Sequence, residues 1–299
     1  MNEIAKRYDA AVQNLVDKLR SDPNVIAVLV MGSVYHGTVW EKSDVDMTVV
    51  VRDQKLERRS FGLYEDNILI NAEIVQRSEL KRGIEKNIGG LFGHSLDATT
   101  KIVYTTDDSL YEYVEENRKI GEADAEKAIF TQINWLLGLM EKIEKWLVVK
   151  NDAEYARYYV LKAADVIANI EVLSRFTPPT REAILEAAAV NPGLMETFYS
   201  APMSKKMNEG QIRALLTKME EYILSHSTPV INVAEEFFGD GEIKTGTQVS
   251  RHFNSPMHYL HPILDYLCER GYLAKISQPA RLTPKGRMNV EETAFIKIT

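Results

Sequence analysis

The sequence predicts an α+β protein, in which a mixed sheet with helices is followed by an all-α helical bundle and then by a smaller segment of helices and strands. Up to about residue 118, apolar runs of strand length alternate with a helical pattern and with turn signals. Residues 119–228 show apolar side chains at helical spacing only. A chain of 299 residues is also longer than a domain with a single hydrophobic core usually is. We therefore predict domains at 1–118, 119–228 and 229–299.

The first domain opens with a helix and continues with four strands. Apolar residues recur at helical spacing over 3–20, and "DPN" then turns the chain into a strand at 25–31. Further strands are predicted at 45–51 and, from the alternation in "NILINAEIV", at 67–75. "KIVYTTDD" forms the fourth strand, after a Gly-rich loop, "GGLFGHS", whose His94 we place on the surface. A twisted mixed sheet with helices behind it is the economical architecture.

The second domain is predicted to be a bundle of about four amphipathic helices with short connections. One long helix covers "DAEKAIFTQINWLLGLMEKIEKWL", and a second covers "EYARYYVLKAADVIANIEVLSRF" and stops at "TPPT". "REAILEAAAV" and "GQIRALLTKMEEYILSH" supply two more. Aromatic side chains of this domain are expected in the bundle core, namely Trp135, Trp146, Tyr155, Tyr158 and Tyr159.

Composition and charge indicate a soluble, cytoplasmic protein. Hydrophobic residues make up 45% and charged residues 26% of the chain, as is typical of globular proteins. The single cysteine, Cys268, excludes an intramolecular disulfide and fits a reducing compartment. The charged, amphipathic start is not a signal peptide, and no apolar run reaches the roughly 18–20 residues that span a bilayer. The net charge of −7 argues against a nucleic-acid coat, although it leaves room for a local basic patch.

One stretch between two apolar strands, "MGSVYHGTVWEKSDVDM" (31–47), carries residues suited to chemistry. Asp44 and Asp46 lie two apart on a strand and share one face, so their carboxylates repel each other. A divalent cation removes that cost, because hard oxygen ligands suit Mg²⁺. Gly32 lets the backbone approach a ligand closely, and Ser33 adds a hydroxyl and an N–H that can hold phosphate oxygens. The stretch therefore predicts a site for a phosphate-bearing ligand and its metal.

A third carboxylate would let this site hold two metal ions. Glu73, on the strand at 67–75, is the first choice, and Glu65, Asp66 and Glu79 are alternatives. Three carboxylates can bind two metals about 3.5–4 Å apart and clamp the attacking and leaving oxygens of an in-line displacement. In the predicted site, the Gly-Ser half of the motif holds a triphosphate and the Asp-x-Asp half holds its metal ions.

The motif "MGS…SDVDM" resembles the hydrophobic-Gly-Ser…Asp-x-Asp signature of the DNA polymerase β-like nucleotidyltransferases. Within that superfamily, "GSVYHG…SDVDM" is most similar to the small-molecule branch that includes kanamycin nucleotidyltransferase. The resemblance implies a nucleotidyltransferase mixed sheet in the first domain. It also implies transfer of a nucleoside monophosphate from an NTP, with ATP the first choice, to a hydroxyl of a small molecule, with release of pyrophosphate. Two Mg²⁺ ions would be the cofactors.

The resemblance also implies roles for single residues. Asp44 and Asp46 would bind both metal ions and act in catalysis, with Glu73 as a third ligand or as the base for the acceptor hydroxyl. Nucleotide contacts are expected from residues between the two strands, namely Gly32, Ser33, His36, Gly37, Lys42 and Ser43.

His36 departs from the family pattern. Relatives of this branch often carry arginine at this position, just before the second glycine. Histidine is mostly neutral at pH 7, so another cation would have to neutralise the phosphates. Lys42 and Arg52 are the candidates.

The third domain is basic and resembles a winged helix-turn-helix. In "LHPILDYLCERGYLAKISQPARLTPKGR" an apolar helix ends at Gly271, "YLAKI" reads as a strand, "SQPA" as the wing turn and "RLTPKGR" as the returning strand. "TGTQVSRHF" would be the preceding helix. Between Lys244 and Val290, seven Lys or Arg stand against only Asp265 and Glu269.

Two interpretations of this basic domain are open. Winged helices often contact DNA, and the candidate contacts are Arg251, Lys275, Arg281, Lys285 and Arg287. The other interpretation is a dimerisation or substrate-positioning module with a solvated basic face, because a fold does not fix a function.

Two classes of function follow. The first is a Mg²⁺-dependent nucleotidyltransferase whose substrates are an NTP and a hydroxyl-bearing small molecule. This interpretation allows a homodimer and involves no membrane. The alternative is a nucleotide-sensing regulator with a degenerate transferase domain that binds DNA through its winged helix. A nucleic-acid-tailing polymerase is disfavoured, because the chain is acidic and its helical domain has no basic cluster.

Overall fold

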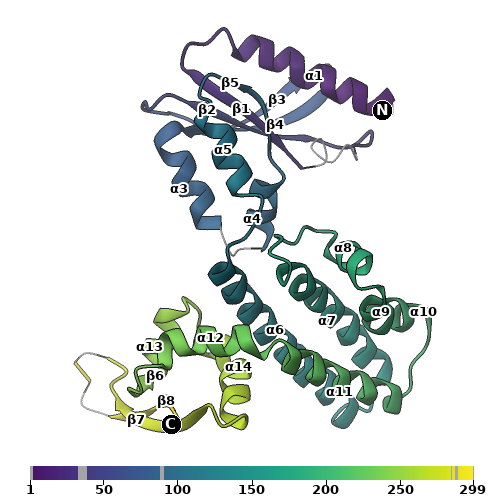
Figure 1. Ribbon diagram of the computed structural model, residues 1–299, viewed down its shortest axis with the longest axis vertical. Coiled ribbons are helices and arrows are strands. Elements are labelled where there is room, and N and C mark those ends of the chain that lie inside the picture. Colours follow the sequence, from purple (N-terminus) through teal and green to yellow (C-terminus); the bar gives the residue numbers. More distant parts are fainter. Residues whose placement is uncertain (1–2, 33–38, 88–90, 284, 287–288, 299) are drawn as a thin grey trace. The chain divides into compact units, whose positions relative to one another are not determined.

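The computed structural model describes residues 3–32, 39–87, 91–283, 285–286 and 289–298 (Figure 1). The chain forms two compact units, each with its own internal contacts. The first unit comprises Met1–Asp124 with Phe176–Arg181, and the second comprises Ala125–Arg175 with Glu182–Thr299. The helical bundle and the C-terminal helices and strands are therefore parts of one unit.

The first unit is built on a mixed sheet, as predicted, with five strands rather than the four expected (Figure 1). Its strands are β1 (Val25–Met31), β2 (Val45–Val51), β3 (Ser60–Glu65), β4 (Ile68–Gln76) and β5 (Lys101–Thr105). They lie in the order β3-β4-β2-β1-β5, with β2 parallel to β4 and the other neighbours antiparallel. The predicted α+β class is confirmed.

Helices cover both faces of this sheet (Figure 1). α1 (Glu3–Leu19) packs on the face to which β2 turns Val45, Met47 and Val49. α3 (Arg77–Asn87) and α5 (Ser109–Glu116) pack on the opposite face, against Val50 and its neighbours. Because side chains alternate along a strand, Asp44 and Asp46 share the second face with Val50.

Two features of the first unit differ from the sequence prediction. Within "GGLFGHS" (89–95), the described residues Leu91–Ser95 do not form a surface loop, because Leu91–Ala98 is a helix, α4, in which His94 is buried. Gly89 and Gly90 lie outside the described residues. β3 was not predicted, since it is an edge strand with no fully buried side chain and therefore carries no strong apolar alternation.

The second unit begins with a bundle of helices. Its long helices are α6 (Glu122–Val148), α7 (Ala153–Leu173) and α11 (Glu209–Ser225). Shorter helical segments connect α7 to α11: α8 (Ala183–Val190), α9 (Pro192–Met195), a π-helical turn (Glu196–Ser200) and α10 (Ala201–Ser204). None of the helices in the described ranges is long and apolar enough to cross a membrane.

The prediction that the bundle aromatics lie in its core is wrong for most of them. Trp135, Tyr155 and Tyr158 are 52%, 44% and 45% exposed, and Trp146 and Tyr159 are half-buried. Alanine and branched aliphatic side chains fill the inner stripe of α7 instead, namely Ala156, Val160, Ala163, Ala164 and Ile167. Helices packed through small residues approach closely, which leaves the large rings at the periphery.

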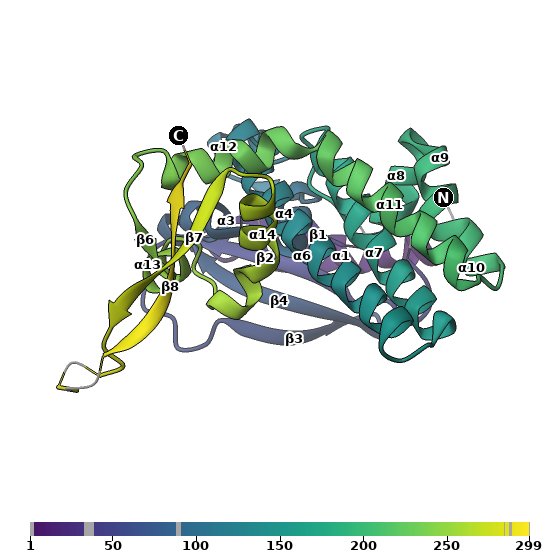
Figure 2. The same cartoon turned by 90° about the horizontal axis from the view of Figure 1, so that it is seen from below.

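The C-terminal part of the second unit alternates helices and strands. It contains α12 (Ser227–Phe238), β6 (Lys244–Thr245), α13 (Gly246–His252), α14 (Met257–Glu269), β7 (Leu273–Ala280) and β8 (Val290–Lys297). The strands form a sheet in the order β6-β8-β7, and Figure 2 shows β7 and β8 as a long hairpin. Gly271 ends α14 as predicted, with φ +72° and with its N–H donated to the Cys268 carbonyl.

The predicted turn of this hairpin is wrong. "SQPA" belongs to β7, where Pro279 pairs with Glu291, and the returning strand is β8 rather than "RLTPKGR". Proline usually signals a turn, but β7 lies at the edge of the sheet, where a residue without an N–H is tolerated.

Candidate functional site

The candidate site lies where β1 ends and β2 begins. Asp44 precedes β2 and Asp46 is its second residue, with the buried Val45 between them. Both carboxylates are exposed and lie on the same face of the sheet. Asp46 pairs with Met31, the last residue of β1, so the segment that follows β1 starts beside this pair of carboxylates.

Gly32 is fitted closely to Asp46. Its φ is +71°, a backbone conformation that side chains disfavour. A Cβ at this position would also lie 3.3 Å from Asp46 Oδ2. Both observations explain a glycine here: the backbone makes a left-handed turn and passes directly beside the carboxylate.

Asn71 completes this cluster, which sequence reasoning missed. β4 runs parallel to β2, and its Asn71 pairs with Asp46. Asn71 Nδ2 donates a hydrogen bond of 2.7 Å to Asp44 Oδ2 and lies 3.5 Å from Asp46 Oδ1. An amide N–H between two carboxylates reduces their repulsion and fixes the Asp44 side chain. The only signal in the sequence is that Asn71 shares a strand face with Glu73.

Glu73 is not brought into this cluster. The register places it opposite Thr48, two residues farther along the strands than the pair of Asp46 and Asn71. Its negative charge acts instead on Arg59, whose pKa is raised mainly by the hydrogen bond to Glu79 and further by Glu73. Within the described ranges, no three His, Cys, Asp or Glu side chains lie close enough together to hold a metal ion. The predicted trio of carboxylates is therefore not assembled.

The alternatives to Glu73 have other partners. Glu65 forms an ion pair of 2.6 Å with Lys18. Asp66 accepts a hydrogen bond from Asn14. Glu79 binds the Arg59 guanidinium through two hydrogen bonds of 2.6 and 3.0 Å. These acids stabilise contacts between elements of the first unit rather than extending the Asp44 and Asp46 pair.

The segment just before Asp44 is held by α1. The hydroxyl of the buried Tyr8 lies 2.6 Å from the Ser43 carbonyl and 3.1 Å from the Trp40 carbonyl. Ser43 Oγ accepts a hydrogen bond from the Trp40 N–H, and the Lys42 ammonium lies 5.6 Å from the centroid of the Trp40 ring. Lys42 and Ser43 thus lie next to the carboxylates, in a turn whose backbone is held by these hydrogen bonds.

Other predicted nucleotide contacts lie elsewhere or are not described. Arg52 follows the far end of β2, where its side chain donates to the Pro23 carbonyl, so it is remote from Asp44. Ser33, His36 and Gly37 lie outside the described residues.

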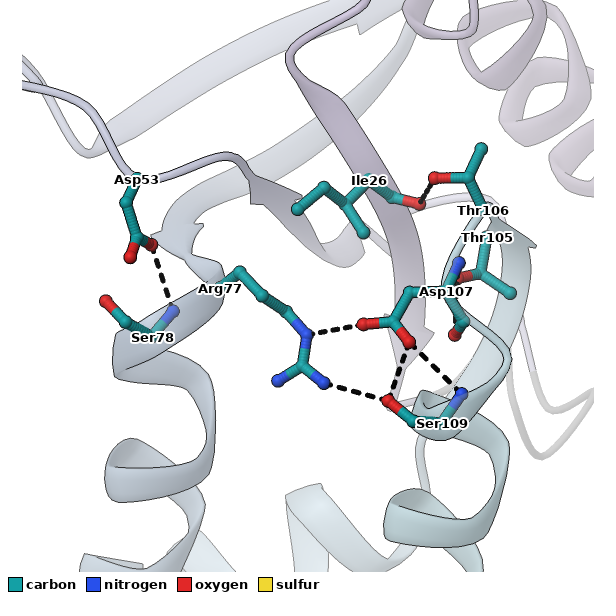
Figure 3. Close-up of polar contacts among 8 residues, drawn as sticks. All are labelled: Ile26, Asp53, Arg77, Ser78, Thr105, Thr106, Asp107 and Ser109. Carbon is teal, nitrogen blue, oxygen red and sulfur yellow. Dashed lines mark hydrogen bonds and ion pairs between the residues drawn. The ribbon is translucent and has the colours of Figure 1, made fainter.

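A second polar cluster, drawn in Figure 3, lies at the other end of β1, where Ala27 pairs with Thr105. Arg77, at the start of α3, donates 2.6 Å from Nε to Asp107 and 3.0 Å from a terminal nitrogen to Ser109, at the start of α5. The hydrogen bonds from Ser109 and the Arg77 guanidinium lower the pKa of Asp107. These contacts join the N-terminal ends of two helices and are structural.

His94 is also structural. Its ring is buried in α4, where Nε2 lies 3.3 Å from the Asn117 carbonyl. Burial lowers the pKa of His94, because the charged imidazolium is costly out of water. The side chain is therefore fixed between helices of the first unit.

The predicted DNA contacts are not gathered on one element. Arg251 is exposed on α13, and Lys275 on β7 forms an ion pair of 2.9 Å with Asp265. Arg281 and Lys285 are exposed in the turn between β7 and β8, and Arg287 lies outside the described residues.

α14, the helix that a winged helix-turn-helix would place on DNA, is bound to α6. Pro262 has no N–H to donate within α14, and the buried Asn134 of α6 bonds the neighbouring Tyr259 carbonyl and Ile263 N–H. Asn134 Nδ2 donates 2.7 Å to the Tyr259 carbonyl, and Asn134 Oδ1 accepts 3.1 Å from the Ile263 N–H. Two hydrogen bonds from one buried side chain therefore fix this helix against the bundle.

Comparison with known proteins identifies the domain that carries the carboxylates. Residues 13–109 match the family model described as "Polymerase beta, Nucleotidyltransferase". No curated protein matches the sequence. A nucleotidyltransferase-like protein from Exiguobacterium sibiricum 255-15 has the same fold, with a TM-score of 0.66 and 14% identity over 98% of this chain and 100% of that one.

A spectinomycin adenyltransferase from Enterococcus faecialis, solved with ATP and spectinomycin, is a more distant match. Its TM-score is 0.30 and its identity 14%, over 70% of this chain and 99% of that one. The matched residues include Gly32, Asp44, Asp46 and Asn71. The chain therefore contains, at residues 13–109, a nucleotidyltransferase domain of the polymerase β family.

Proposed function

We propose that this protein transfers a nucleoside monophosphate from an NTP, ATP first, to a hydroxyl group of a small molecule and releases pyrophosphate. One observation carries the proposal: Asp44 and Asp46 lie side by side, held by Asn71 and bordered by the backbone at Gly32, within the nucleotidyltransferase domain. The adenyltransferase neighbour was solved with ATP and a small molecule, which is the same kind of substrate pair.

The residues of this cluster fit one Mg²⁺ ion that arrives with its nucleotide. Mg²⁺ usually takes one or two carboxylates together with substrate phosphates and keeps several waters. Asp44 and Asp46 supply two exposed carboxylates on one strand face, as such an ion needs. A second ion would lack its third carboxylate, since Asn71 occupies the position beside Asp46. When bound, Mg²⁺ would neutralise the phosphates and polarise the phosphoryl group under attack.

The surrounding residues position this pair of carboxylates. Asn71 holds the Asp44 carboxylate by one N–H and leaves its second oxygen for the ion. Gly32 brings backbone next to Asp46, where N–H groups can meet phosphate oxygens. Lys42 lies two residues before Asp44 and supplies a positive charge at the same edge. Tyr8 keeps the intervening turn in place through the Ser43 carbonyl.

Pyrophosphate release tests the proposal. The full chain is incubated with each of the four NTPs, Mg²⁺ and a panel of hydroxyl-bearing metabolites and aminoglycosides. We expect acceptor-dependent pyrophosphate with at least one combination, reduced at least about 100-fold in Asp46→Asn, because catalytic electrostatic contacts are typically worth this much. Asp9→Asn removes the same charge from an exposed position on α1 and should retain full activity. Equal activity of Asp46→Asn and the wild type would refute the assignment.

A second candidate, a nucleotide-sensing regulator, is favoured by Asn71. With an amide in place of a third carboxylate, the site resembles a nucleotide-binding site more than a two-metal catalytic site. This alternative predicts Mg²⁺-dependent ATP binding without pyrophosphate release for any acceptor.

We also propose that the C-terminal segment of this protein is a scaffold rather than a DNA reader. Asn134 holds α14 against α6, and Lys275 is already paired with Asp265. The proposal predicts no gel shift with duplex DNA at low salt. Specific retardation, reduced in Arg281→Gln/Lys285→Gln, would instead support the regulator.

A further inference from the structure

The second unit contains a groove that is separate from the carboxylates of the nucleotidyltransferase domain. It has a volume of about 410 Å³ and lies between α6, α11 and α14. Each helix contributes residues spaced three or four apart, which form one stripe on its surface. α6 and α14 meet at Gly138, where a Cβ would lie 3.6 Å from Pro262. The groove opens beyond this contact, toward Glu144 on α6 and Glu269 on α14.

The floor of the groove is apolar. It is formed by one or two side chains from each helix, namely Leu137, Met140, Leu216, Ile223 and Pro262. Met140, Leu216 and Ile223 are buried in the unit and present only part of their surface. Such a floor favours methylene groups over a fully hydrated ion, because covering it removes apolar surface from water.

The rim of the groove is acidic. Five carboxylates from all three helices line it: Glu141, Glu144, Glu220, Asp265 and Glu269. Two cations lie near this rim: Arg270 is placed over the Tyr266 ring, and Lys275 pairs with Asp265. In the described part of the chain, Glu141, Glu144, Glu220 and Glu269 form no ion pair or hydrogen bond through their side chains. Lys275 and Arg270 therefore offset only part of the charge of the five carboxylates, and the rim keeps a net negative charge.

The spacing of these carboxylates selects among cations. Glu141 and Glu144 on α6, and Asp265 and Glu269 on α14, are three or four residues apart, which places their Cβ atoms about 5–6 Å apart. A single metal ion needs several ligands converging on one point, and no such group of three exists among the described residues. Charges distributed along both sides of an apolar floor fit a ligand with several cationic groups separated by short methylene chains.

We propose that this groove binds a linear aliphatic polyamine. Its methylene segments would lie on the floor over Met140 and Leu216, and its ammonium groups would reach the carboxylates of the three helices. The volume falls within the range of about 300–1,000 Å³ that small-molecule sites occupy. This proposal is independent of the nucleotidyl transfer proposed above, because no residue of the groove belongs to residues 13–109.

Calorimetric titration of the full chain with spermidine at low ionic strength tests the proposal. Saturable binding of spermidine is expected, whereas butylamine, with one charge, and MgCl₂, with two charges but no methylene chain, should give no saturable binding at the same concentrations. The variant Glu144→Gln/Glu220→Gln should weaken spermidine binding about tenfold, since two charge contacts at a partly exposed site are lost.

A matched variant separates groove binding from general attraction to an acidic protein. Glu196→Gln/Glu221→Gln removes the same charge from the second unit, and Glu221 is the direct neighbour of Glu220 on α11 but does not line the groove. This variant should bind spermidine within twofold of the wild type. Equal weakening of both variants would overturn the proposal. So would the absence of spermidine binding, or binding of a basic amphipathic peptide at the groove without any binding of spermidine.

Discussion

At the scale of single residues, the candidate site depends on Asn71. Sequence reasoning found Asp44 and Asp46, because their spacing, the preceding glycine and the flanking apolar runs are all local signals. The position of Asn71 depends instead on the register between β2 and β4, in which the paired residues Asp46 and Asn71 are 25 apart in the sequence. Asn71 and Glu73 share a strand face, and only the pairing of Asp46 with Asn71 decides between them.

Asn71→Asp should turn the site into three neighbouring carboxylates. Without a divalent cation, the added repulsion and the lost hydrogen bond should lower the free energy of unfolding by about 1 kcal/mol. Mg²⁺ should restore it and stabilise the variant more than the wild type, because a cation compensates the repulsion. Urea unfolding with and without Mg²⁺ measures both effects. A loss that Mg²⁺ does not reduce would show that position 71 does not face the carboxylates.

Gly32→Ala should damage both stability and the site. The left-handed backbone at φ +71° would cost about 1 kcal/mol with a side chain present, and the added Cβ would press on Asp46 Oδ2. We expect weaker MgATP binding together with a lower melting temperature. Gly83→Ala on α3 is the control, because a Cβ there meets nothing within 4 Å. Normal MgATP binding by Gly32→Ala would contradict the close approach.

At the scale of elements, α3 and α5 are joined by the contact of Arg77 with Asp107 (Figure 3). Arg77→Gln should lower the free energy of unfolding by about 1 kcal/mol, since both side chains are about one-third exposed and solvent screens the pair. Arg20→Gln, which removes an exposed pair with Asp17, should change it by less than about 0.5 kcal/mol.

The same contact predicts a dependence on pH. The folded pKa of Asp107 is lowered, so its stabilising contribution is complete above the unfolded pKa of about 3.9 and is lost as pH falls through the folded value. Wild type and Arg77→Gln should therefore differ in stability at pH 6 and converge once the pH lies below the folded pKa of Asp107. Urea unfolding across this range checks the prediction, and a constant difference at all pH values would contradict it.

Elements with strong periodicity were predicted well from the sequence, and elements set by packing were not. β1, β2 and the long helices α6 and α7 agree with the predicted ranges to within a few residues. β3 was missed because none of its side chains is fully buried, so its apolar alternation is weak. The interpretation of Pro279 as part of a turn was wrong, because a strand at the edge of a sheet tolerates proline and the sequence does not show that β7 is an edge strand.

At the scale of the whole molecule, the nucleotidyltransferase domain lies in the first unit and the acidic groove in the second. The groove depends on the attachment of α14 to α6 through Asn134. Asn134→Ala leaves the Tyr259 carbonyl and the Ile263 N–H without these partners, which should cost about 2 kcal/mol. Calorimetric unfolding should show a lower melting temperature for the second unit, and spermidine binding should weaken. An unchanged melting temperature would contradict this anchoring role.

The central claim is that Asp44 and Asp46 bind a divalent cation together with a nucleoside triphosphate. Calorimetric titration of the full chain with ATP, in the presence and absence of Mg²⁺, tests it most directly. We predict that ATP binds with Mg²⁺, that Mg²⁺ alone binds weakly, and that Asp44→Asn/Asp46→Asn reduces MgATP affinity at least about tenfold. Asp9→Asn should match the wild type. If Asp44→Asn/Asp46→Asn bound MgATP as tightly as the wild type, the account of this site would be wrong.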